Sequence, residues 1–152
     1  KEKGIHTAVD TTGYAKWEII ESVLPYTDLF LYDLKCMDSA LHKQVIGVEN
    51  ELILENARRI AAAGGRFWIR IPVIPLLNDS EEHFEKYAAF LSDIRDAVDL
   101  VQLLPYHKMG TVKHERLEDT ATTLDIEPPS ESAVESVRRQ FEALGVNVAG
   151  GT

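Results

Sequence analysis

Apolar and polar positions along the chain repeat with two different periods. Four short runs rich in β-branched and aromatic residues are typical of buried strands: Ile5 to Val9, Leu29 to Leu34, Phe67 to Ile74, and Leu100 to Leu104. The stretches between them carry apolar residues at helical spacing, as Phe84, Tyr87, Leu91 and Ile94 do. The chain is therefore expected to alternate strands and helices.

Capping residues predict where several helices begin and end. Asp79 with Glu82 three residues later resembles a capping box, and Ser130 after two prolines predicts the start of a final helix closed by Gly145. Two helices are expected between the second and third strands, a short one after Asp38 and a longer one that ends at a pair of glycines. The least periodic stretch, from Lys108 to Pro129, predicts a long surface loop.

The order of these elements indicates the fold class. Each predicted strand is followed by a segment long enough for a helix, so the strands should be parallel with right-handed β-α-β connections. We expect an α/β fold with about four parallel strands and flanking helices, formed as one domain over residues 1–152. The composition agrees, because 45% of the residues are hydrophobic and 27% are charged.

Charge and hydropathy exclude several classes of function. A net charge of -9 weighs against nucleic-acid binding, which depends on clustered Lys and Arg. No apolar run approaches the roughly 18 to 20 residues that span a bilayer, and the first residues do not form a signal peptide, so we expect a cytoplasmic protein. The chain begins with Lys1 rather than Met, and we expect further residues upstream.

The metal-binding side chains form no motif. The single cysteine, Cys36, cannot form an internal disulfide or hold an iron–sulfur cluster or structural zinc alone, and we interpret it as an inert small side chain. Four histidines show no ligand spacing and are interpreted as surface residues: His6, His42, His83 and His114. We therefore assign no metal ligand.

Polar residues follow or end all four predicted strands. In parallel β/α folds, ligands bind at the carboxyl ends of the strands, where such residues meet. The candidates are Asp10 and Thr11 after the first strand, Asp33 and Lys35 after the second, Arg70 in the third, and His107 after the fourth. Two carboxylates, an ammonium, a guanidinium and an imidazole would suit a zwitterion that has a carboxylate and an amino group.

Each candidate also has a purely structural interpretation. Asp10 could cap the turn that follows it, and His107 could be an ordinary loop histidine. Asp33 and Lys35 lie two apart on a strand and could form a structural salt bridge. Arg70 needs an anionic partner, which could be Asp33, Asp10 or a ligand carboxylate.

Four strings in order carry a family resemblance: Gly4 to Gly13, Asp33-Leu34-Lys35, Trp68 to Pro75, and Leu103 to His107. This series resembles the activating enzymes of glycyl-radical enzymes, of the pyruvate formate-lyase activating enzyme type. The resemblance extends from Gly4 to about Val148. One departure is that Leu76-Leu77 precede Asn78-Asp79, where related proteins often have a glycine-containing turn.

The resemblance implies a radical S-adenosylmethionine (SAM) enzyme built as a partial (β/α) barrel. The family binds a [4Fe–4S] cluster through Cys-x3-Cys-x2-Cys and SAM through a glycine-rich segment, and neither element occurs in these 152 residues. By position, Asp10, Thr11, Asp33, Lys35, Arg70 and His107 match SAM-pocket residues, with Lys35 and Arg70 suited to the SAM carboxylate. Asp10 and Asp33 suit its ammonium or a hard cation beside it.

The activity implied for the family is reductive cleavage of SAM to a 5′-deoxyadenosyl radical, which takes a hydrogen from a glycine of a partner enzyme. The chain alone is expected to be inactive and to carry no cluster. Two alternatives are a non-catalytic module that binds SAM or a partner, and a barrel lyase that uses Lys35 as a Schiff-base nucleophile. We also expect possible self-association through an exposed edge strand at residues 5–9.

Overall fold

The computed structural model describes residues 2–107 and 127–150 of the chain. Most of the predicted surface loop, residues 108–126, and His114 within it lie outside the described residues. No helix in the described part is long and apolar enough to cross a membrane.

Five parallel strands form one sheet in the order β1-β2-β3-β4-β5. Their bounds are β1 Ala8–Thr11, β2 Leu29–Asp33, β3 Phe67–Val73, β4 Val98–Pro105 and β5 Val148–Ala149. Sequential strands are neighbours throughout, which is the arrangement expected for consecutive right-handed β-α-β units. The predicted α/β class with parallel strands is confirmed.

Helices connect the strands. Their bounds are α1 Trp17–Val23, α2 Ser39–Ile46, α3 Glu51–Ala62, α4 Glu81–Ile94 and α6 Glu131–Glu142, with 3-10 turns η1 Leu24–Tyr26 and η2 Arg95–Ala97. Both helices expected between the second and third strands are present. Ser130 caps the start of the final helix, as the sequence predicts, and its hydroxyl accepts a hydrogen bond from the Ala133 amide.

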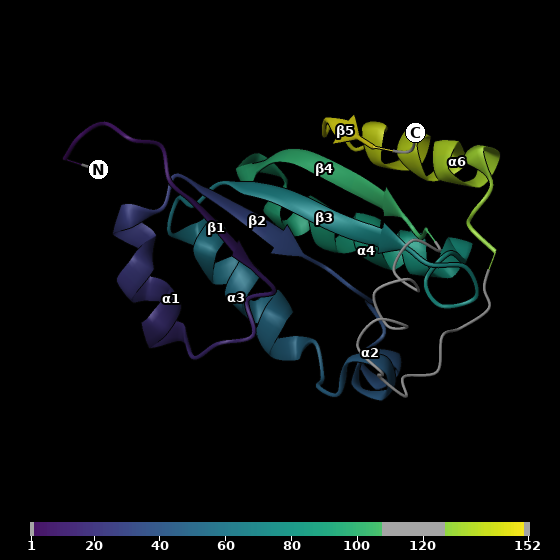
Figure 1. Ribbon diagram of the computed structural model, residues 1–152, viewed down its shortest axis with the longest axis horizontal. Helices are drawn as coiled ribbons and strands as arrows, with labels where there is room; N and C mark the ends of the chain where they lie inside the picture. Colours follow the sequence, from purple (N-terminus) through teal and green to yellow (C-terminus); the bar gives the residue numbers. More distant parts are fainter. Residues whose placement is uncertain (1, 108–126, 151–152) are drawn as a thin grey trace, which may run out of the picture.

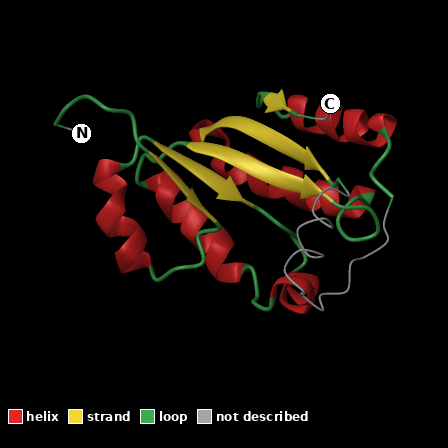
Figure 2. Cartoon of the chain, viewed as in Figure 1, coloured by secondary structure: helices red, strands yellow, loops and turns green. Residues whose placement is uncertain are grey.

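The two faces of the sheet differ. Along β3, the residues from Phe67 to Val73 alternate between buried and accessible, so one side of the strand faces the core. Figures 1 and 2 show α3 and α4 behind the strands, on that side of the sheet. The side chains between sheet and helices form one hydrophobic core. The opposite side, which carries Trp68, Arg70 and Pro72, is called the open face below.

The start of the first predicted strand was wrong, and one strand was missed. The first strand begins at Ala8 rather than Ile5, because Ile5 is exposed and the Thr7 amide instead donates to Asp28 Oδ2 at 2.8 Å. The two-residue strand β5 was not expected at all. It is too short to give an alternating pattern and is held by the Val101 amide, which donates to the Asn147 carbonyl at 2.8 Å.

Two local predictions were also wrong. Ser80, not Asp79, caps α4, since its hydroxyl accepts from the His83 amide, while Asp79 accepts from the Leu76 amide. His42 is not a surface residue. It is buried in α2, and its Nδ1 lies 2.6 Å from the Val48 carbonyl oxygen. Because a carbonyl oxygen can only accept, Nδ1 carries the hydrogen and donates it.

Candidate functional site

Three of the candidate side chains meet on the open face at the carboxyl ends of β1, β2 and β3. Asp33 pairs in register with Arg70 across β2 and β3, so the two side chains leave the sheet on the same side. Asp10 lies in the neighbouring strand, opposite Leu31. The alternation of each strand thus brings two carboxylates to one guanidinium.

Arg70 bridges the two carboxylates. Its Nε donates to Asp33 Oδ1 at 2.6 Å, its Nη1 donates to Asp10 Oδ2 at 3.0 Å, and its Nη2 donates to Asp10 Oδ1. The Arg70 side chain is 20% exposed, Asp33 is 15% exposed and Asp10 is 62% exposed. The hydrogen bond to Asp10, assisted by Asp33, raises the pKa of Arg70 above its already high value.

Lys35 extends this cluster. Its Nζ lies 2.9 Å from Asp33 Oδ2, so the two oxygens of Asp33 face two different cations. The four side chains of Asp10, Asp33, Lys35 and Arg70, which we call the rim cluster, hold two negative and two positive charges. Among the three partners considered for Arg70, the two carboxylates are those that it binds.

Thr11 and His107 are placed differently. Thr11 pairs in register with Tyr32, whose side chain faces the core, and its Oγ1 accepts from the Gly13 amide at 2.9 Å. Thr11 therefore stabilises the turn after β1, the structural role that the sequence had left open for Asp10. His107 is exposed and lies two residues beyond β4, outside the rim cluster as far as the described residues show.

Sequence reasoning missed two buried asparagines behind the strand ends. Asn56 of α3 donates from Nδ2 to the Gly13 carbonyl at 2.8 Å and the Ala15 carbonyl at 2.9 Å. Asn78, in the turn after β3, donates to the Lys35 and Pro72 carbonyls. Asn56 occupies an inward position between Ile53 and Ile60, and a polar residue inside that apolar stripe was the available signal.

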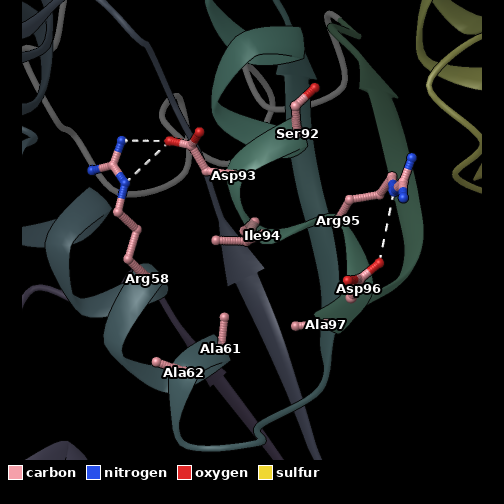
Figure 3. A pocket seen from close by; sticks show the side chains of 9 residues that line it. All are labelled: Arg58, Ala61, Ala62, Ser92, Asp93, Ile94, Arg95, Asp96 and Ala97. Carbon is pink, nitrogen blue, oxygen red and sulfur yellow. Dashed lines mark hydrogen bonds and ion pairs between the residues drawn. The ribbon is translucent and has the colours of Figure 1, made fainter.

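A pocket lies elsewhere on the molecule, between the ends of α3 and α4 (Figure 3). Arg58 and Asp93 point toward each other across it, with Arg58 Nη2 at 3.0 Å from Asp93 Oδ2. Both helices end there before the chain enters the next strand, so this pocket lies near the amino ends of the strands. It is separate from the rim cluster.

The side chains present limit which cofactors could bind. In the described part of the chain, no three His, Cys, Asp or Glu residues gather as a metal site. Cys36 is buried, and burial raises the pKa of its thiol, so it is a poor thiolate ligand. An iron–sulfur cluster does not fit this single thiol. The rim cluster instead presents carboxylates and cations side by side, with charges that sum to zero.

Comparisons with known proteins show what the chain is similar to. The chain is 40% identical over 149 residues to the trans-4-hydroxy-L-proline dehydratase activating enzyme of Clostridioides difficile, covering 97% of this chain and 49% of that enzyme. It is 32% identical over 150 residues to the pyruvate formate-lyase 1-activating enzyme of Escherichia coli K12, covering 97% and 61%. The chain thus spans about half the length of such relatives. No protein-family model matches it.

Structural comparison agrees. A crystal structure of a domain of pyruvate-formate lyase-activating enzyme from Bacteroides vulgatus has a TM-score of 0.82 and 34% sequence identity. The match covers 99% of this chain and 84% of that domain, so it includes the sheet, the helices and the strand ends that hold the rim cluster. The chain therefore belongs to the radical SAM family of glycyl-radical enzyme activating enzymes.

Proposed function

We propose that this chain is the SAM-binding portion of an activase that installs a glycyl radical on a partner enzyme. The observation that carries the proposal is the rim cluster, a neutral set of two carboxylates and two cations at the carboxyl ends of three parallel strands. That edge is where parallel β/α folds bind ligands. Membership of the family indicates that the ligand is SAM and that the reaction is formation of a glycyl radical.

The rim cluster offers complementary groups for the amino-acid end of SAM. Lys35 has three N–H donors and is 35% exposed, so protons not directed at Asp33 can bind the SAM carboxylate. Asp10 is the most exposed carboxylate of the cluster and would accept from the SAM ammonium, or bind a hard cation beside it together with Asp33. Arg70 holds both carboxylates in place and adds positive charge for the SAM carboxylate.

Thr11 and His107 complete the proposed set because their positions match the family's motifs. Thr11 would act through the turn that its hydroxyl stabilises at Gly13. His107 follows β4 at the same edge of the sheet and is exposed, so its imidazole is accessible to a ligand.

The chemistry requires groups that these 152 residues do not contain. SAM, when bound, supplies the adenosyl group, and the [4Fe–4S] cluster that the family uses needs several cysteines where this chain has one. We therefore propose that the chain alone is inactive, and that its residues serve to bind and orient SAM. The proposed partner is a glycyl-radical enzyme, in keeping with the relatives' names, one of which specifies a dehydratase and the other a lyase.

SAM binding by the full-length protein that contains this chain tests the proposal. Lys35→Ala and Arg70→Ala should each weaken binding by about 1 to 3 kcal/mol, the usual loss for a charge-assisted hydrogen bond, measured by titration calorimetry. Arg58→Ala is the matched control, because it removes an exposed ion pair with Asp93 at the opposite end of the sheet from the rim cluster. Unchanged affinity in both rim variants would contradict the proposal.

The alternatives predict other results. A non-catalytic module would bind SAM with the same dependence on Lys35 while the full-length protein carries no cluster. A Schiff-base lyase would show borohydride trapping of a carbonyl compound on Lys35, and the Lys35→Ala variant would abolish that trapping.

A further inference from the structure

Asn78 lies completely buried in the turn between β3 and α4, and it contacts the backbone of Lys35 in the rim cluster. Its Oδ1 accepts from the Ile74 amide at 2.8 Å. Its Nδ2 donates to the Pro72 carbonyl at 2.6 Å and to the Lys35 carbonyl at 3.0 Å. One side chain therefore ties the end of β2 to the end of β3.

The orientation of this amide follows from its neighbours. The Lys35 and Pro72 carbonyls can only accept, so the nitrogen must face them, and the Ile74 amide can only donate, so the oxygen must face it. Every hydrogen-bonding group of the Asn78 side chain is then satisfied by main chain. An aspartate in this place would set a carboxylate oxygen against two carbonyls.

Tyr87 of α4 adds a second tie to the same segment. It is fully buried, and its hydroxyl donates to the Leu34 carbonyl at 3.3 Å and lies 3.4 Å from Asn78 Nδ2. The Leu34 amide in turn donates to the Arg70 carbonyl at 3.0 Å. Three hydrogen bonds thus hold the backbone of Leu34 and Lys35. This backbone follows Asp33 directly and carries the Lys35 side chain that pairs with Asp33.

We propose that Asn78, supported by Tyr87, is a positioning residue for SAM binding. It acts through Lys35, by fixing the backbone from which the ammonium reaches Asp33 and the ligand. The inference deepens the proposed function and rests on it. It goes beyond the rim cluster because neither Asn78 nor Tyr87 would touch the ligand.

A double-mutant cycle on the full-length, cluster-loaded protein tests this role, with SAM affinity measured by calorimetry. Asn78→Ala should weaken binding about tenfold, as loss of supporting hydrogen bonds does at other sites. In a Lys35→Ala background the same change should have no further effect, because the ammonium that it positions is gone. Tyr87→Phe, which removes only one hydroxyl, should give a smaller loss and carries the test if Asn78→Ala does not fold.

Val137→Ala is the matched control, since Val137 is buried in α6, a helix that carries neither Asn78 nor any residue of the rim cluster. It should lower the melting temperature without changing SAM affinity. An equal loss for Asn78→Ala in both backgrounds would overturn the inference, because a general structural effect does not depend on Lys35.

Backbone amide hydrogen exchange of the ligand-free protein separates this inference from the proposed function. Residues 33–37 should exchange faster in Asn78→Ala and Tyr87→Phe than in Val137→Ala. If Lys35→Ala and Arg70→Ala both leave SAM affinity unchanged, the proposed function fails. Faster exchange in residues 33–37 then still supports the role of Asn78 in fixing this backbone. Unchanged exchange in this segment overturns it.

Discussion

Arg70 shows at the scale of one residue how a strand position gathers charged groups from neighbouring strands. Its guanidinium offers a fixed fork of donors, and three of its nitrogens are used on two carboxylates that come from different strands. Lysine at this position would carry the same charge at a single point. The geometry therefore selects arginine rather than any cation.

Arg70→Lys should for this reason destabilise the protein, although it preserves the charge. We expect a loss of about 1 to 3 kcal/mol in the free energy of unfolding, because charge-assisted hydrogen bonds in a partly buried setting are broken. Urea denaturation followed by circular dichroism measures this. Arg58→Lys, in an exposed pair with Asp93, should cost less than about 0.5 kcal/mol. Equal effects of the two changes would show that the fork geometry is unimportant.

At the scale of elements, the turn after β1 explains the glycine in the motif from Asp10 to Gly13. Gly13 has a φ of 73°, and a Cβ placed there would lie 1.7 Å from Tyr32 Oη. That hydroxyl is fixed by a hydrogen bond to the Ile53 carbonyl at 2.6 Å, so it cannot easily move. The glycine therefore allows close packing as well as a left-handed backbone.

Gly13→Ala should consequently destabilise more than the same change at Gly145. Gly145 has a similar φ of 78°, but no atom lies within 4 Å of the position of its Cβ. We expect about 1 kcal/mol for the backbone strain at Gly145, and a further 1 to 3 kcal/mol at Gly13 for overpacking. Thermal unfolding of both variants gives the comparison. Similar melting temperatures would mean that Tyr32 adjusts.

The start of α2 should make stability depend on pH. The Asp38 carboxylate accepts from the Leu41 amide at 2.9 Å, and this bond, with help from Lys86, holds the pKa of Asp38 below its usual range. A depressed carboxyl pKa stabilises the fold above the unfolded pKa, near 3.9, and this contribution is lost as the pH falls through the folded pKa.

Comparison of the wild-type chain with Asp38→Asn isolates this effect, because asparagine also caps helices but carries no charge. The wild type should melt at a higher temperature at pH 7, and the difference should shrink as the pH falls below 4. A constant difference between pH 7 and pH 3 would show that ionisation of Asp38 contributes nothing.

Elements that depend on local patterns could be predicted from the sequence. The strands at β2 and β3, the helix α4 and the cap at Ser130 are examples, since each pattern lies within one segment. Features that depend on contacts between segments could not. β5 exists only because β4 offers it a hydrogen-bonding edge, and His42 is buried only because the Val48 carbonyl folds back onto it.

The site shows the same division. The residues of the rim cluster could be selected from the ends of the predicted strands, but the partners of Arg70 depend on the register that sets Asp33 opposite it. Thr11 was also selected from a strand end, but it does not join the rim cluster. Strand alternation turns Thr11 toward the core, while its neighbour Asp10 faces the rim. Asn78 could not be selected at all, since its importance lies in carbonyls from two other segments.

At the scale of the whole molecule, helices cover one face of the sheet, whereas no helix of the described residues covers the other. Trp68 is 40% exposed and Leu104 is 37% exposed, both on the open face. Within the described residues, β1 pairs with β2 alone, so its outer edge has backbone groups without a strand partner. An unpaired strand edge on a sheet with exposed apolar side chains favours association with another chain.

The 152-residue chain by itself is therefore expected to self-associate as its concentration rises, measurable by sedimentation velocity against a monomer of 17.1 kDa. Ala8→Lys should reduce association, because Ala8 is exposed at the edge strand and a lysine there opposes pairing. Ala62→Lys makes the same charge change at an exposed position of α3, on the helix side, and should leave association unchanged. A chain that stays monomeric at every concentration, or one in which both lysines act equally, would show that the β1 edge does not mediate association.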